Sequence, residues 1–176
     1  PSGGTYVYPQ YVTRIEDADG KVLDEFSTQR REAISFKTAS TVVNLMRGVV
    51  DGGTGSRLRS VYGLKGPIAG KTGTTNDNSD GWFIGYTPYI TAGVWVGGED
   101  RQVHFNSLAL GGGSNMALPI WGIWMTKCLA DPSIEFNAEE QFAEPAGGGL
   151  SFDCEETGMF LGGYGDNYST DGGWDN

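Results

Sequence analysis

The residues best suited to chemistry stand in the run Lys71-Thr72-Gly73-Thr74-Thr75, which offers one ammonium group and three hydroxyls. Gly70-Lys71-Thr72 also resembles the end of a phosphate-binding loop, in which backbone N–H groups cradle nucleotide phosphates. That loop needs four residues between its two glycines, whereas Gly66 and Gly70 enclose three. The following stretch, TTNDNSDG, is rich in turn residues and does not look like a helix start. Nucleotide binding is therefore a minor alternative, and a strand is the preferred prediction.

On a strand, side chains alternate between the two faces, so Thr72 and Thr74 share one face and Lys71, Gly73 and Thr75 share the other. Gly73 has no side chain, so a ligand or another backbone can approach the strand closely there. An ammonium group, hydroxyls and an accessible backbone edge suit an anionic, peptide-like substrate that adds itself as an extra strand. Three letters are a weak motif, and an edge strand with a solvated lysine is the ordinary alternative.

Two segments upstream are expected to be a hairpin and a helix. The run TYVYPQYVTRIEDADGKVLDEF reads as two short strands around Asp19-Gly20, a dipeptide favoured in tight turns. The run SFKTASTVVNLMRGVVDGG reads as a helix that begins after Ser35 or Thr38 as its N-cap and ends at Gly52. Its core-facing side is predicted to consist of Val42, Met46, Val49 and Val50.

The elements after the Lys-Thr-Gly run are predicted to complete a small sheet and cover it. Residues 68–96 are expected to form three antiparallel strands joined by short turns, because residues 90–96 alternate apolar and other side chains. Residues 117–129 are expected to form a helix capped by Ser114 or Asn115. This helix has almost no polar face, which predicts burial against the sheet.

Charge is distributed unevenly along the 176 residues, whose net charge is −10. Up to Lys127, 12 Lys and Arg nearly balance 11 Asp and Glu, whereas the remaining residues carry 11 acidic side chains and no Lys or Arg. We therefore expect a folded region over 1–131 and an acidic, Gly-rich tail over 132–176 that is mostly solvated or loosely docked. The alternative is that the tail docks on another surface through its aromatic residues, Phe142 among them.

Several functions receive no support from composition or spacing. No basic patch with interleaved aromatic residues appears, so nucleic acid is not expected as a partner. The two cysteines and the single histidine match no metal-ligand spacing, and no cofactor is expected. No apolar run reaches the roughly 18 residues of a membrane span. Because the chain begins abruptly, it reads as a piece whose membrane anchor lies elsewhere.

The segment PIAGKTGTTNDNSDGWFIGYTPYITAGVWVGGED resembles the transpeptidase domain of class A penicillin-binding proteins. The resemblance continues upstream in GGTYVYPQYVTRIEDADGKVL and TASTVVNLMRGVVDGGTGSRLR and downstream in GGGSNMALPIWGIWM, over about residues 3–130 in one order. It implies the α+β fold shared by penicillin-binding transpeptidases and serine β-lactamases. In that fold helices cover both faces of a five-stranded antiparallel sheet.

The resemblance also implies a function. The family cross-links peptidoglycan: a serine attacks the penultimate D-Ala of a D-Ala-D-Ala stem peptide, D-Ala leaves, and the acyl group passes to an amine on a neighbouring stem. β-Lactam antibiotics mimic that dipeptide. By resemblance Lys71 supplies positive potential and helps to relay protons, and the hydroxyls of Thr72 and Thr74 bind the terminal carboxylate. The backbone N–H of Thr74 forms half of the oxyanion hole, while Gly73 and Thr75 complete the substrate-binding strand.

Two motifs of the family are not found in the sequence. It contains neither Ser-x-x-Lys, which holds the family's nucleophile, nor Ser-x-Asn. The chain is therefore expected to be the C-terminal half of a transpeptidase domain, without the nucleophilic serine and inactive alone. The missing N-terminal half of the domain is the expected partner, preceded by a glycosyltransferase domain. The expected location is the bacterial cell envelope, on the outer, periplasmic face of the cytoplasmic membrane.

Two alternatives remain open. A serine β-lactamase-like hydrolase carries Lys-Thr-Gly on the same fold and replaces acyl transfer by hydrolysis. A non-catalytic binding or scaffold module would instead use the acidic tail as its functional part.

Overall fold

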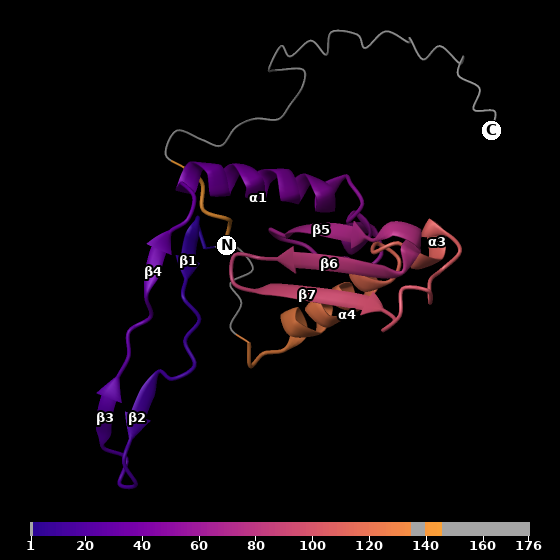
Figure 1. Ribbon diagram of the computed structural model, residues 1–176. Coiled ribbons are helices and arrows are strands. Elements are labelled where there is room, and N and C mark those ends of the chain that lie inside the picture. The colour runs from indigo at the N-terminus through magenta and orange to yellow at the C-terminus, as the bar shows by residue number, and fades with distance from the viewer. Residues whose placement is uncertain (1, 135–139, 146–176) are drawn as a thin grey trace, which may run out of the picture.

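The computed structural model describes residues 2–134 and 140–145, and its centre is a three-stranded antiparallel sheet (Figure 1). The strands are β5 (Ala69–Thr74), β6 (Asp80–Tyr86) and β7 (Thr91–Gly97), in the order β5-β6-β7. Helix α1 (Phe36–Asp51) lies along β5, and helix α4 (Ala117–Ala130) packs against β6 and β7. The predicted meander with a terminal helix on one face is confirmed.

The Lys-Thr-Gly run lies inside strand β5 and not at the start of a helix. Lys71 pairs with Ile84 and Thr72 with Phe83 across the β5–β6 ladder. A short 3₁₀ turn, η1 (Asn76–Asn78), joins the two strands, with positive φ angles at Asp77 and Asn78. Asp and Asn tolerate this left-handed conformation better than most residues. The loop geometry that a phosphate-binding motif requires is therefore not formed here.

One face of the sheet is buried under α4. Phe83 is fully buried and meets Trp121 edge to face, with ring centroids 5.3 Å apart. The indole N–H of Trp121 donates to the carbonyl of Ala92 at 3.2 Å, so its polar atom is satisfied. Gly85 is needed beneath this ring, because a Cβ there would lie 2.7 Å from the Trp121 side chain. This contact fixes α4 on the sheet.

Helix α4 differs from its prediction in two ways. Neither Ser114 nor Asn115 caps it: both accept hydrogen bonds from Arg57, and the N-cap position is Met116, without a side-chain cap. The helix is also buried on one side only, since Ile120 and Ile123 are about half exposed at 50% and 51%. An apolar helix surface therefore faces outwards among the residues that the structure describes.

Helix α1 begins and ends as predicted, with Ser35 as its N-cap. The Ser35 hydroxyl accepts from the backbone N–H of Thr38 at 3.2 Å, and the N–H of Gly52 closes the last turn. Val50 is fully buried, but Val42 is 40% exposed, so the prediction for Val42 is wrong. The reason is that the first half of α1 lies over an apolar pocket, which Val42 lines.

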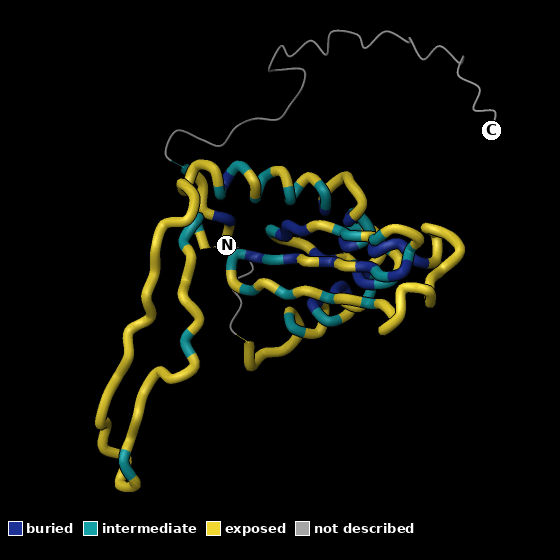
Figure 2. The backbone as a smooth tube through the Cα atoms, in the orientation of Figure 1, coloured by how far each residue is buried: buried dark blue, intermediate teal, exposed yellow. Residues whose placement is uncertain are grey.

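Two small antiparallel ladders form an arm at the N-terminal end, largely exposed to solvent (Figures 1 and 2). Strand β1 (Thr5–Val7) pairs with β4 (Arg30–Glu32), and β2 (Arg14–Glu16) pairs with β3 (Val22–Glu25). The predicted hairpin at Asp19-Gly20 is confirmed, since Gly20 has a positive φ of 81°. The Asp17 carboxylate holds the turn by accepting from the N–H groups of Asp19 and Lys21.

The second face of the sheet is partly open. Trp82, Ile84 and Trp95 point away from α4 and are 44%, 47% and 48% exposed. The resemblance implies five strands with helices on both faces, and the described residues supply three of those strands. Two short helices, α2 (Arg57–Ser60) and α3 (Leu108–Gly111), complete the elements around the sheet.

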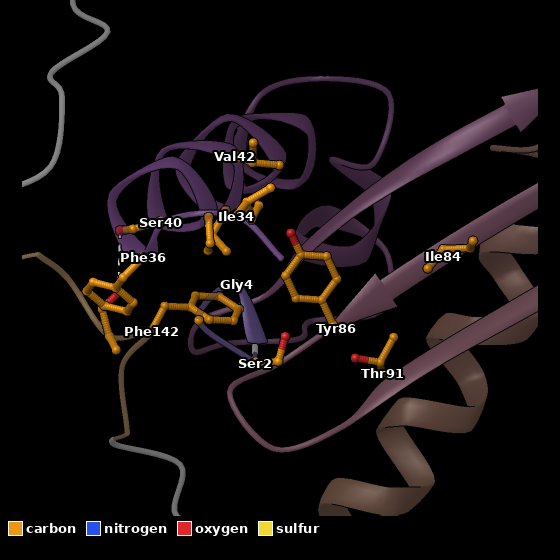
Figure 3. Close-up of a pocket in the computed structure, with 14 residues that line it drawn as sticks. Ser2, Gly4, Ile34, Phe36, Ser40, Val42, Ile84, Tyr86, Thr91 and Phe142 are labelled. Carbon is orange, nitrogen blue, oxygen red and sulfur yellow. Dashed lines mark hydrogen bonds between the residues drawn. The ribbon is translucent and has the colours of Figure 1, made fainter. Parts of the chain in front are cut away.

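Residues 140–145, which belong to the expected tail, lie against α1 and the end of β6. Phe142 is 7% exposed, and its ring meets Tyr86 edge to face at 5.8 Å (Figure 3). The Ser40 hydroxyl donates to the carbonyl of Ala143, and the Tyr89 hydroxyl donates to the Glu140 carboxylate. Burial raises the pKa of the Tyr86 phenol, because a phenolate would lose its hydration there. The remaining tail, apart from residues 132–134, lies outside the described residues.

We expect Phe142→Ala to lower the free energy of unfolding by about 1.5–3 kcal/mol, the usual contribution of a buried phenylalanine side chain. Tyr11→Ala is the matched control, because Tyr11 is 97% exposed and its removal takes away almost no buried apolar surface. Urea unfolding followed by tryptophan fluorescence measures both variants. Equal midpoints for Phe142→Ala and the unchanged chain would show that the contact contributes no stability.

Candidate active site

Strand β5 is an edge strand, and its register decides which backbone groups face outwards. The N–H of Thr75, which directly follows β5, donates to the carbonyl of Asp80 at 3.1 Å, so this residue faces β6. Residues alternate along an antiparallel strand, so the N–H groups of Thr72 and Thr74 point to the opposite, outer edge. No strand pairs with that edge in the described part of the chain. An extended peptide could therefore pair with it.

The hydroxyls of Thr72 and Thr74 lie on the same face of β5, as predicted, because their partners across the ladder are Phe83 and Gly81 on the α4 side. Each hydroxyl is held by a different element. The Thr72 hydroxyl lies 2.8 Å from the hydroxyl of Thr54, in the loop that follows α1. The Thr74 hydroxyl accepts from the backbone N–H of Gly113 at 3.0 Å. The sequence predicted both threonines as site residues, and it predicted neither of the groups that hold their hydroxyls.

Gly113 reaches Thr74 because its backbone passes very close to the sheet. A Cβ on Gly113 would lie 2.2 Å from the carbonyl oxygen of Gly73 and 2.6 Å from that of Trp82. Any side chain there would push the 111–113 segment away from β5 and break the hydrogen bond to Thr74. The run Gly111-Gly112-Gly113 was a visible signal of such a close approach in the sequence.

The other predicted site residues occupy different surroundings. Lys71 lies on the opposite face from Thr72, is exposed, and donates from Nζ to the carbonyl of Thr72 at 2.9 Å. Gly73 lies beside Trp82, whose Cβ would be 3.3 Å from an added Cβ. The Thr75 hydroxyl is engaged within the turn, by the backbone of Asp80 and the hydroxyl of Ser79. These contacts give Thr75 a role in holding the turn beside the site.

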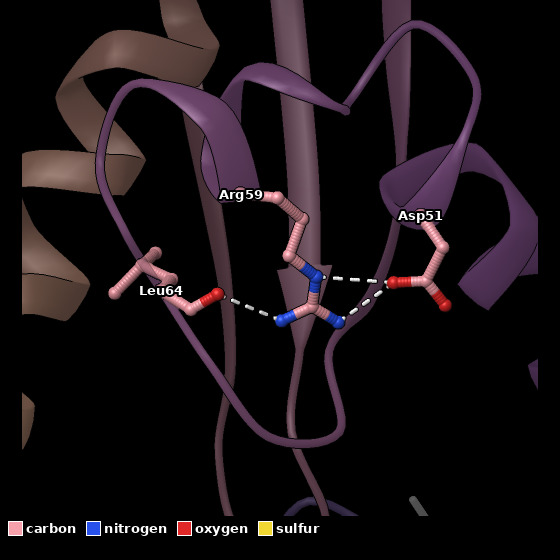
Figure 4. A network of polar contacts seen from close by, with 3 residues as sticks. All are labelled: Asp51, Arg59 and Leu64. Atoms are coloured by element: carbon pink, nitrogen blue, oxygen red, sulfur yellow. Dashed lines mark hydrogen bonds and ion pairs between the residues drawn. The ribbon is translucent and has the colours of Figure 1, made fainter.

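A charged network holds the loop that carries Thr54 (Figure 4). The Arg59 guanidinium donates twice to one carboxylate oxygen of Asp51, at 3.0 and 2.8 Å, and once to the carbonyl of Leu64 at 2.9 Å. Arg59 therefore joins the end of α1 to the segment that leads into β5. The Leu64 carbonyl belongs to a residue only 4% exposed, which makes its hydrogen bond the most protected of the three.

Solved structures share this arrangement of sheet and helices. Penicillin-Binding Protein 1A from Haemophilus influenzae matches with a TM-score of 0.67 over 82% of this chain and 26% of its own, at 21% identity. The penicillin-binding protein PonA1 from Mycobacterium tuberculosis matches with a TM-score of 0.63 over 84% of this chain and 39% of its own, at 24% identity. The fold is therefore the α+β fold of penicillin-binding transpeptidases, as the resemblance implied.

Residues 2–101 match the family model of the penicillin-binding protein transpeptidase domain, and the chain belongs to this family. Penicillin-binding protein 1A of Clostridium acetobutylicum is 41% identical over 122 residues, which cover 69% of this chain and 14% of the relative. Penicillin-binding protein 1A of Aquifex aeolicus is 37% identical over 118 residues, which cover 67% of this chain and 15% of the relative. The chain thus spans about one seventh of the length of these relatives.

The described residues add two further observations on what the chain could bind or cross. They contain no group of three or more His, Cys, Asp or Glu side chains placed to hold a metal ion. None of their helices combines the length and apolar character that crossing a membrane requires.

We expect Arg59→Met to destabilise the chain by about 1–3 kcal/mol, because it leaves the partly buried carbonyl of Leu64 without its donor. Asp51→Asn should cost less, about 0–1 kcal/mol, since it weakens only the half-exposed ion pair. Lys65→Met is the matched control, because Lys65 is exposed beside Leu64. Thermal melting followed by circular dichroism ranks the three variants. A larger loss for Asp51→Asn than for Arg59→Met would contradict the assignment.

Proposed function

We propose that this chain supplies the substrate-binding strand of a serine-type D,D-transpeptidase that cross-links peptidoglycan stem peptides and binds penicillin. The observation that carries the proposal is strand β5, an edge strand whose outer side carries the N–H groups of Thr72 and Thr74 beside their two hydroxyls. A D-Ala-D-Ala end is an extended peptide with a terminal carboxylate. It can pair with this edge through its backbone while the hydroxyls receive its charge.

Each proposed role follows from the donors available at the edge. Gly113 donates its N–H to the Thr74 oxygen, so the Thr74 hydroxyl proton is available to the substrate carboxylate. The outward N–H of Thr74 is suited to receive the oxyanion that develops during acyl transfer. Lys71, an exposed cation beside the same edge, supplies positive potential and a route for protons. Thr72 is the second hydroxyl donor, Gly73 permits the close approach, and Thr75 holds the turn.

The nucleophilic serine is proposed to come from an upstream part of the same domain. The sequence has no Ser-x-x-Lys motif. The open sheet face with Trp82, Ile84 and Trp95 offers an apolar surface against which further helices of the domain can pack. We further propose that the whole protein works in the bacterial cell envelope, on the outer face of the cytoplasmic membrane, with a glycosyltransferase domain before the transpeptidase; its similarity to penicillin-binding proteins 1A supports the envelope location.

Thr74→Val in the complete domain should slow acylation by penicillin about ten- to a hundredfold, the effect of losing a charge-assisted hydrogen bond of roughly 1.5–3 kcal/mol. Valine also leaves the Gly113 N–H without an acceptor, so the change removes structure as well as a donor. Thr74→Ser keeps the hydroxyl and is the matched control. Stopped-flow measurement of acylation compares the variants. An unchanged rate in a folded Thr74→Val variant would remove Thr74 from the site.

The chain alone should form no covalent adduct with a fluorescent penicillin, because acylation needs a serine whose proton is taken by a nearby base. The assay incubates the purified chain with labelled penicillin, denatures it and compares labelling with and without excess unlabelled drug. A band at the mass of the chain that disappears with unlabelled drug would contradict the proposed origin of the serine. A band that appears only after the upstream segment is added supports the proposal, and its slow hydrolysis separates a transpeptidase from a β-lactamase.

A further inference from the structure

The hydroxyl of Thr54 touches the site although nothing in the proposed reaction uses it. Its Oγ1 lies 2.8 Å from Oγ1 of Thr72. We propose that Thr54 is a positioning residue, which orients the Thr72 hydroxyl toward the carboxylate of the substrate. This inference rests on the proposed function, and it adds a residue from outside strand β5 to the recognition of that carboxylate.

The loop around Thr54 is held firmly enough for such a role. The N–H of Gly55 donates to the carbonyl of Val49 at 2.9 Å, which folds the loop back onto the end of α1. Added Cβ atoms at Gly53 and Gly55 would lie 3.0 and 3.1 Å from the Val49 carbonyl oxygen, so larger residues there would have to displace backbone. The Arg59 network ties both ends of the same loop. These contacts hold the backbone around Thr54 against the end of α1 and the segment that leads into β5.

The direction of the hydrogen bond gives the contact its function. A threonine hydroxyl has one proton and can accept from two directions. When Thr54 donates its proton to the Thr72 oxygen, the Thr72 proton is free to point to a bound carboxylate. Gly113 gives Thr74 the same arrangement, because its N–H can only donate. Two hydroxyls of one strand would then face the substrate charge, each turned outwards by a donor from a different element.

This arrangement should favour ligands that carry a free carboxylate. The orientation of the Thr72 proton matters for a ligand that carries a carboxylate and matters little for one whose carboxylate is masked as an ester. A purely structural contact between the loop and β5 would affect both ligands alike. Comparing a penicillin with its methyl ester therefore separates positioning from support of the fold.

The test uses the complete transpeptidase domain and measures the second-order rate of acylation. Thr54→Val should lower the rate with penicillin about three- to tenfold, the effect of one neutral hydrogen bond. It should leave the slower rate with the methyl ester within about twofold of the unchanged domain. Thr54→Ser should restore the rate with penicillin, because serine keeps the donor. Ser56→Ala is the matched control. It removes a hydroxyl from the same loop, and the Ser56 side chain makes no capping hydrogen bond to α2.

A second measurement keeps the inference testable if Thr54→Val unfolds. In the background of Thr72→Val, the milder Thr54→Ala should cause no further loss with penicillin, because the hydroxyl that it positions is gone. Equal losses with penicillin and its ester, no rescue by Thr54→Ser, or an additive loss in the double variant would each overturn the inference. If the unchanged domain is not acylated by penicillin, the proposed function fails and takes the inference with it. Normal acylation of both the unchanged domain and Thr54→Val overturns the inference alone.

Discussion

The pairing of β5 with β6 determines what the Lys71–Thr74 segment presents. It directs the N–H of Thr75 to Asp80 and, by alternation, those of Thr72 and Thr74 to the outer edge. A shift of the register by one residue would exchange the two faces and direct Lys71, instead of the threonines, toward α4. Phe83 lies on the α4 side, where it meets Trp121, and this contact fixes which way β6 faces. Thr72 pairs with Phe83 across the ladder and therefore lies on the same face.

Close backbone approach is the second constraint on the site. Gly113 and Gly85 lie where an added Cβ would come within 2.2 Å of the Gly73 carbonyl and 2.7 Å of Trp121. Gly85 lets the Trp121 side chain approach the sheet closely, whereas Gly113 lets a loop donate directly to Thr74. The same absence of a side chain therefore serves packing at one position and the site at the other. Glycine is required at both positions by contact distance alone, because neither residue has a positive φ angle.

The sequence predicted the elements near the site well because their signals are local. Alternation along residues 90–96, the turn chemistry after Thr75 and the hydroxyl of Ser35 each act within a few residues, and the structure contains all three features. The site is held by hydrogen bonds between segments that lie apart in the sequence, such as Thr54 with Thr72 and Gly113 with Thr74. No periodicity reports such pairs. The predicted cap of α4 failed for the same reason, since Asn115 is engaged by Arg57, 58 residues earlier in the chain.

The exposed apolar surfaces are a further difference between what the sequence predicts and what the structure contains. Helix α4 is apolar on all sides, as a helix buried all round should be, yet Ile120 and Ile123 face outwards in the described part of the chain. Trp82 and Trp95 show the same mismatch on the open face of the sheet. Side chains of this size on both sides of one sheet would reduce solubility in a freestanding domain. Their exposure supports the proposal that further helices of the domain pack on these surfaces, and the chain spans only about one seventh of the length of its relatives. If further parts of the domain cover these surfaces, as proposed above, the hydrophobic pattern of the sequence corresponds to burial in the complete domain.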